Sequence, residues 1–355
     1  MALGRMQVTD LRCLQNASLD LDASFTLICG QNASGKTSLL EAMYVLGRGR
    51  SFRTRRLEHL IRRGRDRFVI FGEVGAGDRL IPIGVEGTRQ GLRARISGAA
   101  AGSLAELALA LPIQIIDPEV HKLIEDGPLR RRRFLDWGVF HVEPRFVGNW
   151  QRYYQALRQR NASLRSRQPR AVTAAWDGDL VQFAEWLTQS RSHYVKTLQA
   201  QVQHIGAEIL GMDVALQYRR GWGADFHYAE ALQQSWSADQ DRGLTLVGPH
   251  RAELQVLTNG VAAKDYISRG QQKLLAAALL IAQLRLFPAD SLVQPTLLLD
   301  DPAAELDDER LSRLINEVAG RGMQLVVTTL HAGFAAFGLP GRSYRIHDGQ
   351  LAECG

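Results

Sequence analysis

The pattern of apolar and polar residues along the chain changes character twice. Residues 6–11 and 17–21 alternate apolar and polar side chains, and residues 68–74 and 80–85 form a second β-rich stretch. From about residue 127 to residue 240 turn signals thin out, and apolar side chains recur every three or four positions, which predicts helices. After residue 244 short apolar runs alternate with helical patterns again. The runs predict strands at 253–257, 296–299 and 325–328, and the helical patterns predict helices at 271–287 and 308–320.

This order predicts a single α/β domain that a helical insertion splits in sequence. We expect residues 1–126 and 243–355 to form the α/β domain and residues 127–242 to form the helical lobe. With 355 residues, of which 45% are hydrophobic and 23% charged, the chain has the composition of a soluble globular protein. It contains no apolar run long enough to span a bilayer and no secretory signal pattern, so no membrane association is expected.

Cysteine usage and net charge indicate the compartment and the class of partner. Cys13, Cys29 and Cys354 are isolated thiols without metal-ligand spacing, which favours a cytoplasmic location. The net charge is +6, and only five of the 43 basic residues are lysine. An excess of arginine favours phosphate-bearing partners, because the guanidinium group matches phosphate oxygens. A general bias of the genome toward arginine is the alternative explanation.

Residues 30–37 match the phosphate-loop pattern G-x-x-x-x-G-K-[ST]. An apolar run, Phe25–Cys29, precedes the loop and a helical apolar pattern at 38–46 follows it, which is the context that the pattern requires. Lys36 is expected to reach the β- and γ-phosphates and the Thr37 hydroxyl to ligate Mg²⁺. A glycine-rich structural turn is the alternative. The expected nucleotide-binding residues of the loop are Gly30, Gln31, Asn32, Ala33, Ser34, Gly35, Lys36, Thr37 and Ser38.

Two further motifs complete the predicted nucleotide site. The apolar run Thr296–Leu299 ends in Asp300, expected to hold Mg²⁺, and Asp301, expected to orient the attacking water. An apolar strand followed by an acidic turn is the plainer interpretation. Ser268, Gly270 and Gln271 begin a helical pattern, where a hydroxyl and unpaired N–H groups favour a second anion site. An ordinary helix cap is the alternative there.

Arginines crowd the segment that follows the phosphate loop, with few acidic residues among them. We expect these side chains to contact DNA phosphates without reading base sequence, although a solvated charged face is the usual explanation of such a run. A second cluster, residues 130–133, lies in the predicted lobe, and its DNA role is equally open. The expected DNA-binding residues are Arg53, Arg55, Arg56, Arg62 and Arg63.

The order of phosphate loop, S-x-G-Q helix start, apolar strand with two aspartates and the segment 304–307 resembles the ABC-type ATPases. Within that class, segments 47–54, 127–138, 248–251 and 348–350 resemble the RecF family, so the resemblance covers nearly the whole chain. It implies an ABC-type P-loop ATPase head with an inserted helical lobe, which uses ATP and Mg²⁺. It also implies an ATP-dependent homodimer in which Ser268, Gly270 and Gln271 contact the γ-phosphate bound by the other copy.

The resemblance further implies a role in recombinational repair and replication. A family member binds duplex DNA near single-strand gaps and junctions, works with RecR and RecO to load RecA, and resets itself by slow ATP hydrolysis. The segment 304–307 would cross the dimer interface. His331 is a candidate switch histidine or a solvated loop residue, and Gln114 is a candidate Mg²⁺ or water contact or a plain strand-end residue. Ala33 stands where related loops carry glycine, so we expect its backbone to avoid a strongly positive φ.

Two other functions fit some of these motifs. A nucleotide-binding subunit of an ABC transporter has a membrane partner and usually a shorter separation than the 231 positions between Thr37 and Ser268. A structural DNA clamp of the SMC/Rad50 type has long heptad arms, and the insertion here is too short for them.

Overall fold

The computed structural model describes residues 2–304, 308–319, 322–330 and 339–354. Its backbone forms two compact units, one made of residues 1–120 and 289–355 and the other of residues 121–288. The predicted lobe, residues 127–242, falls within the second unit, and its exact limits stay a prediction. His331 and residues 305–307 lie outside the described part of the chain.

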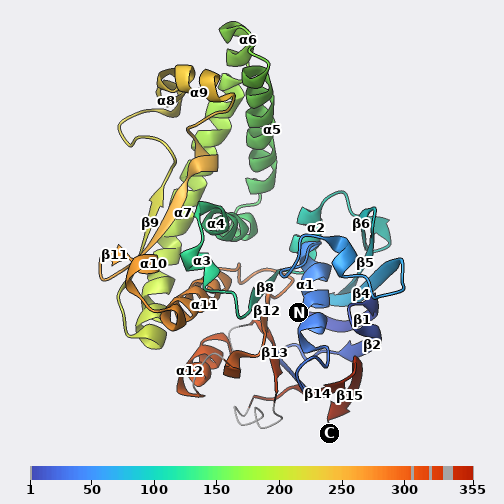
Figure 1. Cartoon of the computed structure of the whole chain (residues 1–355). Helices are drawn as coiled ribbons and strands as arrows, with labels where there is room; N and C mark the ends of the chain where they lie inside the picture. Colours follow the sequence, from blue (N-terminus) through green and yellow to red (C-terminus); the bar gives the residue numbers. More distant parts are fainter. Residues whose placement is uncertain (1, 305–307, 320–321, 331–338, 355) are drawn as a thin grey trace. The chain divides into compact units, whose positions relative to one another are not determined.

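The first unit contains an antiparallel sheet whose strands follow the order β2-β1-β4-β5-β6-β7 (Figure 1). Buried and exposed residues alternate along β1 and β2, as the sequence pattern predicts for strands with one face on a core. Residues 6 and 19 are paired partners, and so are residues 8 and 70. The strands are β1 Leu3–Leu11, β2 Leu14–Asp20, β4 Arg67–Ala76, β5 Arg79–Thr88, β6 Gly91–Ile96 and β7 Ala99–Ala100.

A second sheet in the same unit has the order β15-β14-β3-β13-β12-β8. All neighbouring strands are parallel except β15, which runs antiparallel to β14. The strands β3, β12 and β13 are buried throughout, which explains their continuous apolar sequences. The strands are β3 Phe25–Cys29, β8 Ile113–Ile116, β12 Thr296–Leu299, β13 Gln324–Thr329, β14 Arg342–His347 and β15 Gln350–Cys354.

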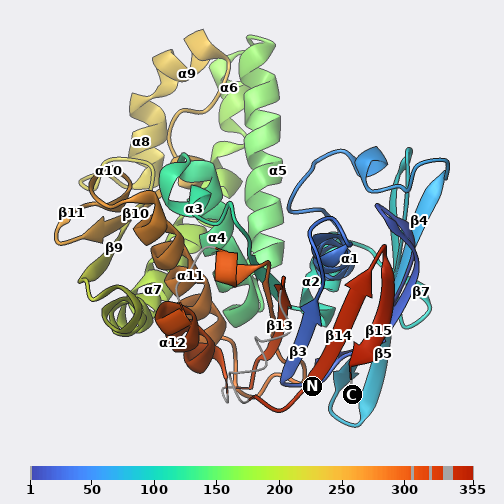
Figure 2. The same ribbon diagram turned by 60° about the horizontal axis from the view of Figure 1, so that its bottom comes forward.

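Helix α1 Lys36–Arg48 packs against both sheets and is buried along nearly its whole length (Figure 2). Its apolar residues, such as Leu39, Leu40 and Met43, join the core with Met6 of β1 and Val326 of β13. Most of its side chains are apolar, so the helix has to be enclosed in this way. The remaining helical segments of the unit are η1 Leu57–His59, α2 Leu104–Ala110, η3 Pro302–Ala304 and α12 Asp308–Val318.

The second unit is mostly helical and is built around the 34-residue helix α7 Asp177–Leu210, which packs against α4, α5, α11 and β9 (Figure 1). It also holds a small antiparallel sheet in the order β11-β10-β9. Its other elements are α3 Lys122–Glu125, α4 Pro128–Val142, α5 Phe146–Arg165, α6 Arg170–Ala174, β9 Val214–Arg219, α8 Tyr228–Gln234, α9 Trp236–Arg242, η2 Pro249–Arg251, β10 Glu253–Thr258, β11 Val261–Ala262, α10 Ala263–Tyr266 and α11 Arg269–Arg285.

Two buried arginines tie the segment 244–251 to the helices of this unit. Arg160 of α5 is fully buried, pairs with Asp177 and Asp239, each at 2.8 Å, and donates to the Thr245 hydroxyl at 2.7 Å. Arg191 of α7 is also fully buried; it pairs with Asp136 at 2.7 Å and donates to the carbonyl of residue 249. Such buried charges are tolerated only where partners satisfy them, so these contacts fix the path of the segment.

Candidate nucleotide and DNA sites

The phosphate loop connects the carboxyl end of β3 to the amino end of α1, as the sequence predicts. Two glycines are needed for its shape. A Cβ on Gly30 would lie 2.4 Å from the carbonyl oxygen of Ile346, and Gly35 has a φ of 114°, a conformation that side chains with a Cβ rarely adopt. The first helical hydrogen bond joins Leu39 N–H to the Gly35 carbonyl at 3.0 Å. The N–H groups of residues 36–38 precede that bond and point out of the helix end, where they favour an anion.

Two hydrogen bonds to the second sheet and one within the loop hold the loop in place. The Gly30 N–H donates to the Thr329 carbonyl at 3.1 Å, and the Ser34 N–H donates to the Gln31 carbonyl at 3.2 Å. Gly349, in the turn between β14 and β15, donates its N–H to the Ser34 carbonyl at 2.9 Å. The segment 348–350, noted in the sequence only as a resemblance, therefore supports the phosphate loop directly.

Ala33 differs from expectation. Its φ is 64°, in the left-handed region, so the prediction that its backbone avoids a positive φ is wrong. The hydrogen bonds on either side of Ala33 fix the loop path, and an alanine is small enough to accept the conformation at a cost of about 1–2 kcal/mol.

Lys36 and Ser34 present polar groups to the inside of the loop. The Lys36 side chain is 6% exposed, and its ammonium donates to the carbonyls of Gly30 at 2.6 Å and Gln31 at 3.1 Å. The Ser34 hydroxyl is buried and has no hydrogen-bond partner among the described residues. A buried hydroxyl without a partner is costly, which indicates a ligand for it. A ring of N–H groups, an ammonium and a spare hydroxyl together suit a polyphosphate.

Thr37 and Asp300, the two predicted Mg²⁺ ligands, lie together. The Thr37 hydroxyl donates to Asp300 Oδ1 at 3.0 Å, although 263 residues separate them. Thr328 of β13 also donates its hydroxyl to Asp300 Oδ1 at 3.0 Å, a contact that the sequence did not reveal. Burial raises the pKa of the Asp300 carboxyl, while the hydrogen bonds from Thr328 and Thr37 act in the opposite direction.

This arrangement fits Mg²⁺ bound together with a nucleotide. Among the described residues no group of three or more His, Cys, Asp or Glu side chains forms a metal cage. Mg²⁺ usually takes one or two protein oxygens and completes its shell with phosphates and water, so Thr37 and Asp300 supply the right number and type of ligand. Asp300 is 7% exposed, and a cation beside it would offset the cost of burying its charge.

Of the other two site residues predicted at strand ends, Asp301 lies beside Asp300, whereas Gln114 lies further back along its strand. The Asp301 N–H donates a hydrogen bond to the Thr328 hydroxyl at 3.0 Å, and the φ of Asp301 is 49°. Gln114 is 7% exposed within β8 and pairs with Leu297, three residues before the level of Asp300. The strand register instead puts Asp117, just beyond β8, level with Asp300, whose N–H donates to the Ile116 carbonyl. The sequence analysis did not identify Asp117; its only local signal is the short, mostly apolar run at 113–116 that ends in this aspartate.

Ser268, Gly270 and Gln271 form the amino end of α11 in the second unit. The Ser268 hydroxyl accepts from the Gln271 N–H at 3.3 Å, and the Gln271 side chain accepts from the Ser268 N–H at 3.0 Å, so the two residues form a capping box. Ser268 and Gly270 are exposed. A Cβ on Gly270 would meet nothing within 4 Å, and the φ of this glycine is not positive, so the fold of the chain itself does not require a glycine there.

The predicted DNA-binding arginines all lie on the first unit. Arg55 and Arg63 are exposed and form no ion pair with another described residue. Arg56 is 73% exposed with Glu58 at 3.9 Å, and Arg62 is 31% exposed with Asp10 at 3.6 Å. These distances leave most of the positive charge available to solvent.

Arg53 is set apart from that group by its neighbours. Glu41 of α1 is fully buried and accepts from Arg12 at 2.9 and 3.0 Å and from the Ser51 hydroxyl at 2.5 Å, and Arg53 approaches it to 3.7 Å. Arg53 also lowers the pKa of Asp300 slightly, although burial dominates. Glu41 therefore connects the arginine segment to the phosphate-loop helix.

The cluster at 130–133 is largely used inside the second unit. Arg131 is 8% exposed and pairs with Glu253 through two hydrogen bonds of 2.8 and 2.9 Å. Arg132 donates to the Ala252 carbonyl at 2.7 Å, and Arg130 pairs with Asp126. These contacts make the cluster a structural element of the unit and weaken the case for it as a DNA surface.

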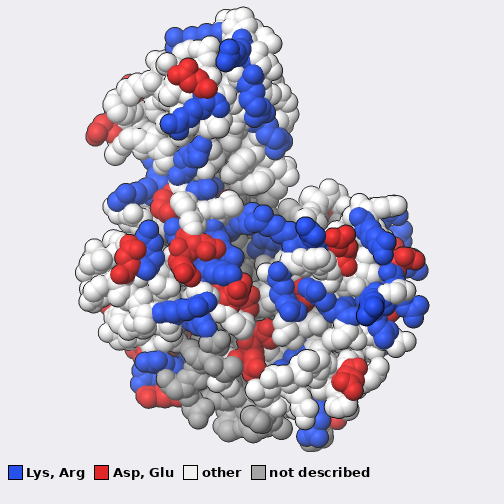
Figure 3. All heavy atoms as spheres, in the orientation of Figure 1, with Lys and Arg blue, Asp and Glu red and all other residues white. Residues whose placement is uncertain are grey.

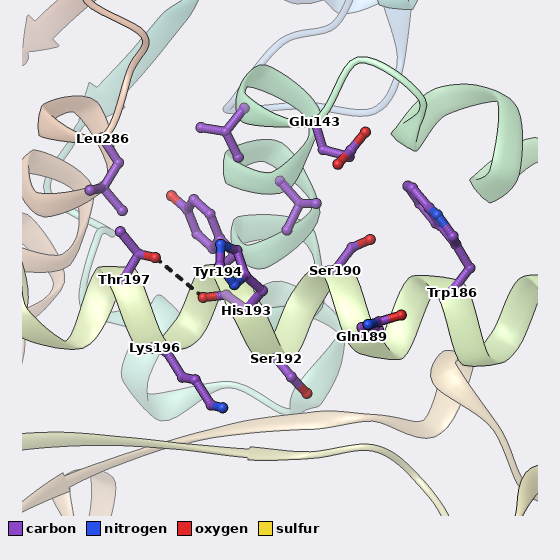
Figure 4. A pocket seen from close by; sticks show the side chains of 12 residues that line it. Glu143, Trp186, Gln189, Ser190, Ser192, His193, Tyr194, Lys196, Thr197 and Leu286 are labelled. Atoms are coloured by element: carbon purple, nitrogen blue, oxygen red, sulfur yellow. Dashed lines mark hydrogen bonds between the residues drawn. The ribbon is translucent and has the colours of Figure 1, made fainter.

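A pocket of about 630 Å³ lies in the second unit between the ends of α4 and α11 and the middle of α7. Figure 4 shows Trp186, Gln189 and Ser190 along α7, with Glu143 opposite them. None of the predicted site residues lines it, so it is separate from the nucleotide machinery.

Comparison with known proteins identifies the family. Residues 2–343 match the RecF/RecN/SMC N terminal domain family. The chain is 36% identical to the DNA replication and repair protein RecF of Shewanella pealeana, covering 99% of both chains. It is 37% identical to RecF of Vibrio parahaemolyticus over 93% of both. The chain belongs to the RecF family.

Solved structures agree with this assignment. The recombination mediator protein RecF-ATP of the RecFOR pathway has a TM-score of 0.89 and 25% identity, covering 100% of this chain and 98% of that one. The Smc head bound to the C-winged helix domain of ScpA has a TM-score of 0.62 at 16% identity, which shows a shared fold. The predicted ABC-type α/β ATPase head with a helical region is thus confirmed. Because RecF proteins align with the chain over almost its whole length, the comparison argues against a transporter subunit. No helix in the described residues is long and apolar enough to cross a membrane.

Proposed function

We propose that this RecF-family chain is a cytoplasmic ATP-dependent DNA-binding protein that binds ATP and Mg²⁺ at the phosphate loop. The observation that carries the proposal is the 3.0 Å hydrogen bond between Thr37 and Asp300, which brings the two nucleotide motifs into one site. Lys36 and the N–H groups of residues 36–38 would hold the phosphates, with the Ser34 hydroxyl as an additional donor. The bound ATP supplies negative charge, and Mg²⁺ neutralises part of it beside Asp300.

The second part of the proposal is a homodimer in which each copy completes the other's site. Ser268, Gly270 and Gln271 would contact the γ-phosphate held by the partner. The exposed position of Gly270 supports this, since glycine is a poorer helix former than most residues and neither a positive φ nor a close contact within the chain requires it. A nucleotide that binds two faces stabilises the dimer by mass action.

The third part concerns DNA and hydrolysis. Exposed Arg55, Arg56 and Arg63, with Arg53 and Arg62, would bind duplex phosphates near single-strand gaps. Asp301 would orient water for slow hydrolysis that resets the dimer. The relatives' place in the RecFOR pathway supports RecR and RecO as partners, with RecA loading as the outcome.

The test is the Lys36→Ala variant, with Lys196→Ala as a matched control, because Lys196 is an exposed lysine of α7 that is not among the predicted site residues. Lys36→Ala should lose ATP binding by at least about 100-fold, since a charge-assisted phosphate contact is removed from a buried site. It should also lose ATP-dependent duplex binding, measured by calorimetry and fluorescence anisotropy. Retention of both properties in Lys36→Ala contradicts the proposal.

A further inference from the structure

One stretch of the helical unit has an unusual charge pattern. Residues 144–176 contain seven arginines and no aspartate or glutamate. The whole chain carries 43 basic and 37 acidic residues, so the abundance of arginine in the chain does not explain the lack of acidic residues here.

The fold exposes six of these seven arginines along α5 and the segment that follows it. The stretch forms α5, the turn after it, and α6. Arg160 is the buried member, paired with Asp177 and Asp239. Figure 3 shows Lys and Arg side chains along the edge of the unit where Figure 1 draws α5, without acidic side chains among them. The α5 surface is defined by the exposed residues Arg145, Arg152, Arg158, Arg165, Arg167 and Arg170.

These charges are not neutralised within the described part of the chain. Arg145 has Glu143 at 3.8 Å, and no ion pair between described residues involves the other five. Arg152 lies over the Phe183 ring at 5.7 Å and Arg170 over the Trp236 ring at 5.3 Å. Aromatic contacts of this kind orient a guanidinium group and leave its charge available to a partner.

The shape and chemistry of the α5 surface fit a duplex backbone. A 20-residue helix is about 30 Å long, and Arg152 and Arg165 stand about 20 Å apart along it, so the charges extend over a large part of a turn of B-DNA. The exposed residues between the arginines include Gln151, Gln155 and Gln159, which are also phosphate donors. No large apolar side chain of α5 is prominently exposed among the described residues, which disfavours a protein partner along that helix, although Val172 of α6 is 50% exposed.

We propose that the α5 surface is a phosphate-binding surface for duplex DNA, additional to the arginines of residues 53–63 on the other unit. This inference rests on the proposed function, because it adds a second contact to the same DNA-bound state. The binding is independent of base sequence and depends on salt. Each phosphate contact contributes about 0.9 to the slope of log K against log salt.

The test compares duplex binding by the full chain with ATP across a salt series, read by fluorescence anisotropy. R152Q/R158Q/R165Q should weaken binding at least about tenfold near 0.1 M salt and reduce the slope by about 2 to 3. R152K/R158K/R165K keeps the charge and should keep most of the slope. R5Q/R313Q/R342Q removes the same charge from ion-paired positions and should change the slope little.

The possible results separate this inference from the proposed function. Unchanged affinity and slope in the α5 glutamine variant, with the wild type binding DNA, overturn the inference alone; an acidic protein partner would give this result. An equal loss in the ion-paired control overturns it as well, because net charge would then explain the effect. Absence of duplex binding by the wild type overturns the proposed function too. Circular dichroism and ATP binding confirm that each variant is folded.

Discussion

At the scale of single residues, Ala33 shows how strongly the phosphate loop constrains its backbone. The loop is held at Gly30, Ser34 and Gly349 by hydrogen bonds to the sheet and turn around it. An alanine between these points adopts a φ of 64° because the chain on both sides is fixed. The free-energy cost of this conformation is confined to Ala33, so it can be measured as a change in the free energy of unfolding when Ala33 is replaced.

We expect Ala33→Gly to stabilise the protein by about 0.5 kcal/mol, since relief of the left-handed conformation exceeds the added freedom of the unfolded chain. Thermal or denaturant unfolding measures this change. Ala162→Gly is the matched control, because Ala162 is exposed within α5 and its replacement should destabilise by about 1 kcal/mol. A loss of stability in Ala33→Gly equal to that in the control would show that Ala33 is not strained.

Sequence patterns identified site residues that belong to a short motif, but they missed residues that reach the site from neighbouring strands. Lys36, Thr37 and Asp300 follow from short patterns, and the structure brings Thr37 and Asp300 into contact. Thr328 and Asp117 reach the same site only because β13 and β8 flank β12 in the sheet. Strand order depends on long-range pairing, so a single sequence pattern does not contain it.

At the scale of elements, the segment 244–251 is held by polar contacts inside the helical unit. His250 contacts the Tyr153 hydroxyl through Nδ1 at 2.7 Å and donates from Nε2 to the Thr245 carbonyl at 2.9 Å. Burial lowers the pKa of His250 to about 4, with nearby Arg251, Arg132 and Arg191 acting in the same direction. The neutral imidazole is therefore the form that the fold accepts.

This pKa predicts a loss of stability in acid. Between about pH 6.5 and pH 4 the unfolded state binds a proton at His250 and the folded state does not, so stability falls as the pH falls. From pH 7 to pH 5 the loss attributable to His250 is about 2 kcal/mol. His250→Gln should remove this part of the pH dependence in urea unfolding, whereas His347→Gln, at an exposed position, should not. Identical pH profiles for wild type and His250→Gln would contradict the assignment.

The element predictions succeeded where one periodicity dominates. The buried strands β3 and β12 and the apolar helix α1 are at the expected positions. Strand β9, Val214–Arg219, lies inside the stretch predicted as helical, because its pairing with β10 stabilises an extended conformation that local spacing does not signal. Strands β14 and β15 were not predicted, since polar residues such as Arg342, Arg345 and Glu353 interrupt their apolar pattern.

At the scale of the whole molecule, the residues predicted to bind the nucleotide are divided between the two compact units. Lys36, Thr37 and Asp300 belong to the first unit, and Ser268 and Gly270 belong to the second. Exposure of the S-x-G-Q element leaves it available to another copy. We therefore expect this element to close on the ATP that a partner copy holds.

The most direct measurement is the mass of the protein in solution by light scattering, with ATP and with ADP. The wild type should form a dimer with ATP and remain a monomer with ADP. Ser268→Arg should remain a monomer with ATP while still binding it, whereas Ser103→Arg, at the start of α2, should behave as wild type.

Mixing two defective variants makes the test specific. A mixture of Lys36→Ala and Ser268→Arg should recover part of the ATP-dependent dimer, because one intact site forms from the phosphate loop of one copy and Ser268 of the other. An ATP-dependent dimer of Ser268→Arg alone, with the same affinity as the wild type, would contradict the account.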